Sequence, residues 1–120
     1  MNVFDASALL AFVQGEPGAD VVERELLVGG VCSAANWSET AQIVARRRDW
    51  SLARSLLLSY PLSIEPVLLV DAERAAQLWA SGSGLSLGDR LCLATGERME
   101  ALVWTADTSW GAGGRMRQIR

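Results

Sequence analysis

The feature that most constrains the fold is the alternation of short apolar runs with longer amphipathic segments. The apolar runs are flanked by turn-forming residues, which is typical of strands, and lie at 2–4, 31–34, 62–65 and 101–105. Between them, apolar residues at helical spacing predict helices at 6–14, 17–29, 36–48, 50–60, 71–80 and 86–99. Strands that alternate with helices form a mostly parallel sheet covered on both faces. We therefore expect one domain, residues 1–120, with a three-layer α/β/α architecture and a central sheet of four to five strands.

Capping residues and glycines set the expected ends of these elements. Asn36 is suited to cap the third helix, and Ser86 opens the sixth helix after a serine- and glycine-rich loop. Leu62 and Ile64 alternate with polar residues, which predicts a half-exposed strand. The glycine-rich stretch 111–114 precedes residues 116–119, a candidate for one more short strand.

Missing residue types exclude several classes of chemistry. The chain has no histidine and no lysine, which removes a Ser-His-Asp triad, a histidine-dependent ribonuclease, a Schiff base, a P-loop lysine and an ordinary zinc site. Cys32 and Cys92 lack metal-binding spacing and are expected to be two buried thiols. The remaining chemistry depends on carboxylates, hydroxyls, arginines or a hard metal ion.

No apolar run is long enough to span a membrane, and Asp5 interrupts any secretory signal, so the cytoplasm is the expected location. The net charge is −3, but every positive charge is an arginine, the cation that binds phosphate bidentately. Two arginine clusters stand out, Arg46, Arg47, Arg48 with Arg54, and Arg115, Arg117 with Arg120. A phosphate-binding role and a solvated helix face both remain open for them.

Four acidic residues fall where the chain passes from an expected strand or loop into a helix or turn, namely Asp5, Glu39, Asp89 and Asp107. Loops at the carboxyl ends of parallel strands form the binding crevice of such sheets, so the four carboxylates are expected to lie close together. Each also has a structural interpretation. Glu39 and Asp89 stand three residues after a helix cap, as in a capping box, and Asp5 and Asp107 can be turn residues. The other acids, including Asp71, are expected to be solvated surface.

Gathered carboxylates repel one another unless a cation lies among them. Mg²⁺ and Mn²⁺ prefer oxygen ligands and commonly bind carboxylates together with phosphate oxygens. A metal held by carboxylates alone suits phosphodiester hydrolysis by an activated water, which leaves a 5′-phosphate and a 3′-hydroxyl.

Four stretches together resemble a known family: VFDASALLAF at 3–12, SAANWSE at 33–39, LSLGDRLCLA at 85–94 and LVWTADTSW at 102–110. They are similar to the PIN-domain ribonucleases, in particular the VapC toxins of VapBC toxin–antitoxin pairs. The resemblance implies that Asp5, Glu39, Asp89 and Asp107 are the catalytic acids and metal ligands, with Asp5 and Asp89 favoured as direct ligands. Polar residues at matching positions support the acids, namely Ser7, Asn36, Ser86 and Thr105.

The resemblance further implies an endoribonuclease that depends on Mg²⁺ or Mn²⁺, forms a homodimer and is silenced by a cognate antitoxin protein. The substrate is RNA, and the candidate RNA-contacting arginines are Arg46, Arg47, Arg48 and Arg90. The five tryptophans are compatible with interface surface, although most are expected in the core.

Three other functions compete with that of a toxin-type ribonuclease. A phosphoaspartate enzyme, with Asp5 as nucleophile, is disfavoured because such enzymes use a lysine, and the dehalogenase type needs an aspartate where this chain has Ser7. A PIN-like nuclease in general RNA processing stays open. A PIN-like domain that only binds also stays open, although it would not need four mutually repelling acids.

Overall fold

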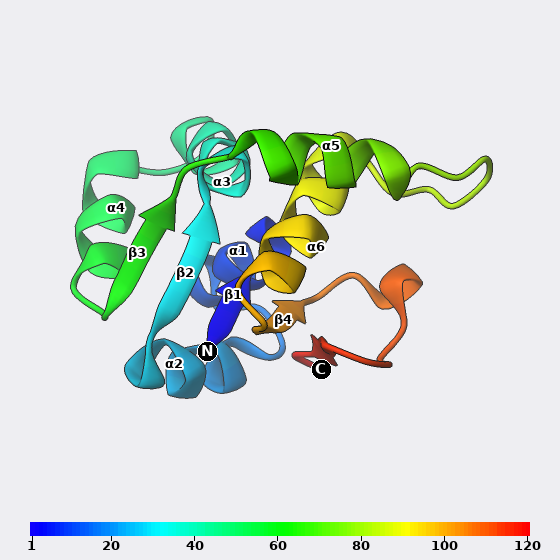
Figure 1. Ribbon diagram of the computed structural model, residues 1–120. Helices are drawn as coiled ribbons and strands as arrows, with labels where there is room; N and C mark the ends of the chain where they lie inside the picture. The colour runs from blue at the N-terminus through cyan, green and yellow to red at the C-terminus, as the bar shows by residue number, and fades with distance from the viewer.

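The computed structural model describes residues 1–120 and forms an α/β domain with five strands and six α-helices (Figure 1). In chain order the elements are β1 Asn2–Phe4, α1 Ala6–Gln14, α2 Ala19–Val28, β2 Gly30–Ser33, α3 Ala34–Ala45, α4 Trp50–Leu58, β3 Leu62–Glu65, α5 Leu69–Gln77, α6 Leu87–Arg98, β4 Leu102–Thr105, the 3₁₀ helix η1 Thr108–Trp110, and β5 Met116–Gln118.

The sheet has the strand order β3-β2-β1-β4-β5, and every neighbouring pair is parallel. The expected parallel sheet is confirmed, and it is parallel throughout rather than mostly so. The candidate last strand is also confirmed, because Val103 to Thr105 pair with Met116 to Gln118. Parallel order places the carboxyl ends of β1, β2 and β4 at one edge of the sheet.

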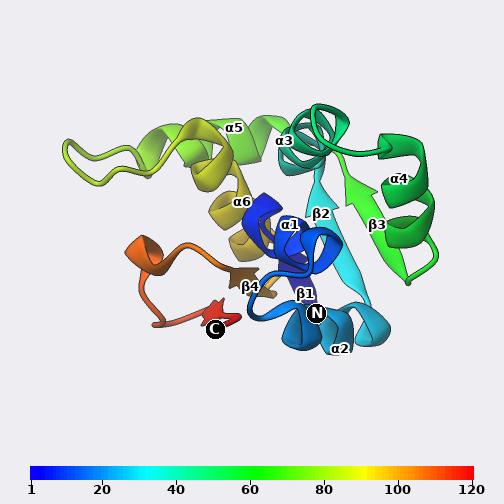
Figure 2. The same ribbon diagram turned by 180° about the vertical axis from the view of Figure 1, so that it is seen from behind.

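Alternate residues of the central strand β1 enter two separate cores. Phe4 joins residues of α1 and α2, including Leu9 and Leu26, on one face. Val3 joins Cys92 of α6 and Val103 of β4 on the other. Figures 1 and 2, which view the molecule from opposite sides, show α1 and α6 on opposite faces of β1. The expected three layers follow from this period-two burial.

The predicted starts of three helices differ from the structure by two residues each. Ser33, not Asn36, caps α3, because its hydroxyl accepts the backbone N–H of Asn36. Asn36 lies inside the helix and is fully buried. α2 begins at Ala19 rather than near Pro17, after Gly18 in the left-handed region. α5 spans Leu69–Gln77 rather than 71–80 because the Asp71 carboxylate accepts the backbone N–H of Leu68 and so starts the helix earlier.

The predictions for cysteine and tryptophan are largely confirmed. Both thiols are buried and free, and burial raises the pKa of each. Trp110 is buried, and three further tryptophans pack partly buried against the core, namely Trp37, Trp50 and Trp104. Trp79 is 64 % exposed. None of the helices combines the length and the apolar character needed to cross a membrane.

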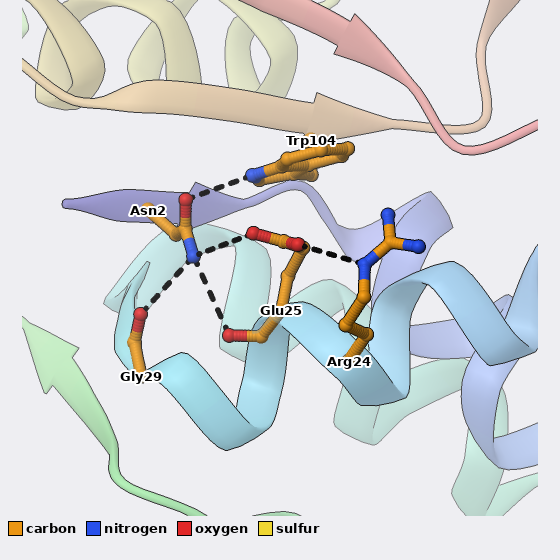
Figure 3. Close-up of polar contacts among 5 residues, drawn as sticks. All are labelled: Asn2, Arg24, Glu25, Gly29 and Trp104. Carbon is orange, nitrogen blue, oxygen red and sulfur yellow. Dashed lines mark hydrogen bonds and ion pairs between the residues drawn. The ribbon is translucent and has the colours of Figure 1, made fainter.

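Asn2, the first residue of β1, joins the end of α2 to the sheet (Figure 3). Its amide Nδ2 donates to the carbonyls of Gly29, at 3.2 Å, and Glu25, at 3.4 Å, and lies 3.5 Å from the Glu25 carboxylate. Its Oδ1 accepts from the Trp104 indole N–H at 2.9 Å. Asn2 is only 4 % exposed, so its hydrogen bonds have no water to replace them.

We expect Asn2→Asp to lower the free energy of unfolding by about 2 kcal/mol. The substitution keeps the acceptor for Trp104 but places a carboxylate against two carbonyls and the Glu25 carboxylate. Urea denaturation at pH 7 measures the loss. Trp104→Phe removes only one hydrogen bond, so it should cost less. Equal stability of Asn2→Asp and the wild type would contradict this account of the Asn2 contacts.

Candidate active site

Asp5 directly follows β1 and is held by one residue of α1 and one of β4. It occupies the N-cap position of α1, with φ −70° and ψ 155°, but its side chain does not cap that helix. Instead Asp5 Oδ2 accepts hydrogen bonds from the hydroxyls of Ser7 and, at 3.0 Å, Thr105. The side-chain cap that a turn interpretation requires is therefore absent, and the carboxylate points into a polar network while the residue is 4 % exposed.

The hydroxyls of Ser7 and Thr105 are fixed by backbone donors. Ala106 N–H donates to Ser7 Oγ at 2.9 Å, and Asp107 N–H donates to Thr105 Oγ1 at 3.0 Å. Because each hydroxyl oxygen already accepts an N–H, its single proton is free to point at Asp5. The network thus links the turn after β4 to the acid after β1 and leaves Asp5 Oδ1 without a protein donor.

Burial raises the pKa of Asp5 from 3.8 to about 6. The hydrogen bonds from Ser7 and Thr105 counteract this effect, and the negative charges of Asp89 and Glu39 raise the pKa further. Glu39 and Asp89 therefore lie close enough to Asp5 for their negative charges to act on it.

Asn36 joins the Glu39 region to the start of α6. Its Nδ2 donates to Glu39 Oε1 at 2.8 Å and to the Gly88 carbonyl at 3.1 Å. The predicted capping box of Asn36 with Glu39 is wrong, because Ser33 is the cap and Glu39 receives the amide of Asn36. A Cβ at Gly88 would lie 2.5 Å from Glu39 Oε1, so a larger residue at this position would force the Glu39 carboxylate to shift. Gly88 was not among the predicted site residues; the signal for it in the sequence is a glycine between the cap Ser86 and the acid Asp89.

Asp89 and Asp107 each use one carboxylate oxygen to support local backbone. Asp89 Oδ2 accepts Ser86 N–H at 2.8 Å while Ser86 Oγ accepts Asp89 N–H at 3.1 Å, which confirms the capping box. Asp107 Oδ1 accepts from the backbone N–H of Ser109 at 2.9 Å and from its hydroxyl at 2.7 Å. The turn interpretation therefore holds for Asp107.

The four carboxylates share one pattern: one oxygen is held by protein donors and the other is not. The unbonded oxygens are Asp5 Oδ1, Glu39 Oε2, Asp89 Oδ1 and Asp107 Oδ2. No three acidic or cysteine side chains lie close enough together, as they stand, to hold a metal ion. Hard oxygen donors without a counter-charge fit Mg²⁺ or Mn²⁺, and the protein donors on the opposite oxygens are of the kind that orient metal ligands.

The candidate RNA-contacting arginines differ in their surroundings. Arg46, Arg47 and Arg48 follow the last turn of α3, are exposed and form no ion pair. Arg90 is half-buried and donates to the Ala75 carbonyl at 2.9 Å, so part of its guanidinium serves to join α6 to α5. The predicted RNA contact of Arg90 competes with this structural role.

The family model described as PIN domain matches residues 3–112. The chain belongs to the PIN domain family. The matched part of this PIN domain contains all four acids and ends before β5. A sequence search among curated proteins found no match.

This PIN domain also resembles solved structures. A chain of a toxin-antitoxin complex from Klebsiella pneumoniae has a TM-score of 0.80 and 18 % identity, with 100 % of this chain and 98 % of that chain covered. Mycobacterium tuberculosis VapC20, a Sarcin-Ricin loop cleaving toxin, has a TM-score of 0.76 and 18 % identity, with 95 % of each chain covered. At these identities the similarity establishes that the fold is shared across nearly the whole chain.

Proposed function

We propose that this PIN domain is an endoribonuclease that depends on Mg²⁺ or Mn²⁺ and acts as the toxin of a toxin–antitoxin module. The observation that carries the proposal is the shared pattern of the four acids, each with one oxygen fixed by the protein and one left for a cation. The proposal is supported by membership of the PIN family and by the fold shared with two toxin structures.

The metal ligands we propose are Asp5, Glu39, Asp89 and Asp107, with Asp5 and Asp89 as the most direct. A bound divalent cation supplies Lewis acidity, which lowers the pKa of a water and stabilises charge on the phosphate. Asp89 lies in the first turn of α6, where the helix dipole attracts negative charge. Ser7 and Thr105 keep Asp5 Oδ2 occupied, which would leave its other oxygen for the cation.

We propose a protein antitoxin and a second copy of the chain as partners, in the cytoplasm. The surface supports protein partners, because large apolar side chains are exposed over the start and end of α5 and beside α6: Val67, Leu68, Leu69, Val70, Trp79 and Leu87. Four of these side chains, Val67 to Val70, are consecutive, and exposed apolar patches are typical of interaction sites. The Klebsiella pneumoniae relative was solved as a toxin-antitoxin complex.

We expect the purified protein to cleave RNA with added Mn²⁺ and to leave a 5′-phosphate and a 3′-hydroxyl, whereas EDTA should abolish cleavage. Asp89→Asn should lower the rate by at least about a hundredfold, since it removes a charged ligand. Gel assays and end-group analysis of the products measure both effects. Asp20→Asn, the same change at an exposed site, is the control.

Induced expression tests the toxin role. Wild-type protein should arrest growth in cells without an antitoxin, and Asp89→Asn should not. If the wild type cleaves RNA but is harmless, a role in general RNA processing is favoured. If it neither arrests growth nor cleaves RNA with Mn²⁺, the nuclease proposal is wrong and a binding module remains.

A further inference from the structure

The loop that carries Asp107 has few connections to the sheet. No backbone-to-backbone hydrogen bond joins residues 107–111 to β4 or β5; the internal bonds are Trp110 N–H to the Asp107 carbonyl and Gly111 N–H to the Thr108 carbonyl. Trp110 packs into the core at 7 % exposure. On the side of β4, the only hydrogen bond is from Asp107 N–H to Thr105 Oγ1. The direction of the Asp107 carboxylate therefore depends on whatever holds the other side of this loop.

Gln118 of β5 holds that side. Its Nε2 donates to the Asp107 carbonyl at 2.9 Å and to the Gly111 carbonyl at 2.8 Å, so one amide group joins both ends of the loop. Gln118 pairs with Thr105 in the sheet register, which places it next to the strand that precedes Asp107. Gly111 has a φ of 74°, a left-handed conformation that turns the chain back toward β5.

The chemistry of these contacts requires a neutral amide or another group with two protons. Both hydrogens of the Gln118 amide are used, and its Oε1 is buried without a partner. A buried acceptor without a donor is costly. A flipped amide would place oxygen against two carbonyls, so the observed orientation is the one the loop demands. Gln118 lies outside residues 3–112, the part of the chain that matches the PIN family model, whereas the 107–111 loop lies inside it.

We infer that Gln118 is a positioning residue that fixes Asp107 in the carboxylate site by clamping both ends of the 107–111 loop. Thr105 fixes Asp107 through its backbone N–H, and Gln118 fixes it through its backbone carbonyl. With both backbone groups held, the carboxylate is restricted to rotation about its own side-chain bonds, which Ser109 limits further. The catalytic part of this inference rests on the proposed function.

The test uses two variants of the full-length protein. Gln118→Glu keeps the shape but removes both donors, and Gln118→Met removes the donors without adding charge. We expect hydrogen exchange of the amides of 107–111 to accelerate about tenfold or more in both, because two hydrogen bonds are lost. We expect kcat to fall about tenfold at unchanged KM for RNA, and half-saturation to require several-fold more Mn²⁺ in direct binding measurements. Gln77→Glu, on the distant helix α5, should leave all three quantities as in the wild type.

Unchanged exchange of residues 107–111 in both variants would overturn the clamp. Faster exchange with wild-type kcat and Mn²⁺ binding would overturn the positioning of Asp107, since the loop would then be held without consequence for the site. A variant that unfolds globally accelerates exchange throughout the chain, and the comparison then rests on the other variant. A wild-type protein that cleaves no RNA refutes the proposed nuclease, and loop exchange still decides whether Gln118 clamps the loop.

Discussion

Asp5→Asn should abolish RNA cleavage and yet make the metal-free protein more stable. Cleavage should fall by at least about a hundredfold, because a neutral amide is a poor ligand for a hard cation. The melting temperature without metal at pH 7.5 should rise by about 10 °C. The gain is expected because Asn Oδ1 can accept from Ser7 and Thr105 in place of Asp5 Oδ2, while its amide donates toward the neighbouring acids.

The stability gain should depend on pH in a defined direction. The pKa of Asp5 is raised from 3.8 to about 6 in the folded protein, so ionising this side chain costs stability. The cost is absent below pH 3.8, grows as the pH rises toward 6 and then stays constant at about 3 kcal/mol. The wild type and Asp5→Asn should thus be similarly stable near pH 3.5 and differ most above pH 6.

Added Mn²⁺ should reverse the order, because a cation stabilises only the protein that keeps the carboxylate. Thermal unfolding with EDTA and with Mn²⁺, each at pH 3.5, 5 and 7.5, measures the whole pattern. Asp20→Asn is the matched control at an exposed site and should follow the wild type. If Asp5→Asn is less stable than the wild type at pH 7.5 without metal, ionisation of Asp5 does not destabilise the folded protein.

Asp71→Asn should lower the free energy of unfolding by about 3 kcal/mol, although Asp71 lies outside the active site. The Asp71 carboxylate is 1 % exposed and binds the Arg98 guanidinium through two hydrogen bonds, of 2.8 and 3.1 Å. It also accepts Leu68 N–H, which starts α5. Loss of the negative charge leaves Arg98 with Glu65, at 3.1 Å, as its one acidic partner.

Acid should remove this difference. Burial acts to raise the pKa of Asp71, but the hydrogen bonds from Arg98 and Leu68 outweigh it and lower the pKa below 3.8. The stability that Asp71 provides is therefore complete above pH 4 and lost as the pH falls through its lowered folded-state pKa. Urea denaturation at pH 7 and at decreasing acid pH measures the change.

The matched control for Asp71→Asn is Glu97→Gln, at a second ion pair between the same two helices. Arg74 and Glu97 are 2.7 Å apart, but both side chains are about two-fifths exposed. Solvent screens such a pair, so the effect should be small and should shrink in high salt. If the two variants lose equal stability, burial is not what makes the Asp71–Arg98 pair strong.

These two helices also show what the sequence cannot reveal. The run Asp71-x-Glu73-Arg74 has an arginine nearby, so a solvated surface was expected. The actual partner of Asp71 is Arg98, 27 residues later. Local charge patterning shows only neighbours along a helix, and a pair across two helices requires knowledge of how they pack.

Prediction was most successful where a local pattern carries the structure. The strand-to-helix seam at Asp5 and the capping box at Ser86 and Asp89 follow from residues within a few positions, and both lie where they were expected. The prediction that Asn36 caps α3 was wrong because Ser33, the last residue of β2, occupies the cap position instead. The Ser7 and Thr105 positions came from the family resemblance. The hydrogen bond from Thr105 to Asp5 joins residues 100 positions apart, and no local sequence pattern predicts such a contact.

The central place of β1 in the sheet sets the order in which this protein can assemble as it is synthesised. β1 cannot complete its pairing until β4, its neighbour on one side, has been made. The Thr105 hydroxyl of β4 holds Asp5 across 100 positions of sequence, and β5 with Gln118 follows later in the chain. A strand cannot pair with residues that do not yet exist, and such distant contacts form slowly. A nascent chain therefore lacks a complete carboxylate site until β4 and the turn that carries Asp107 have been made.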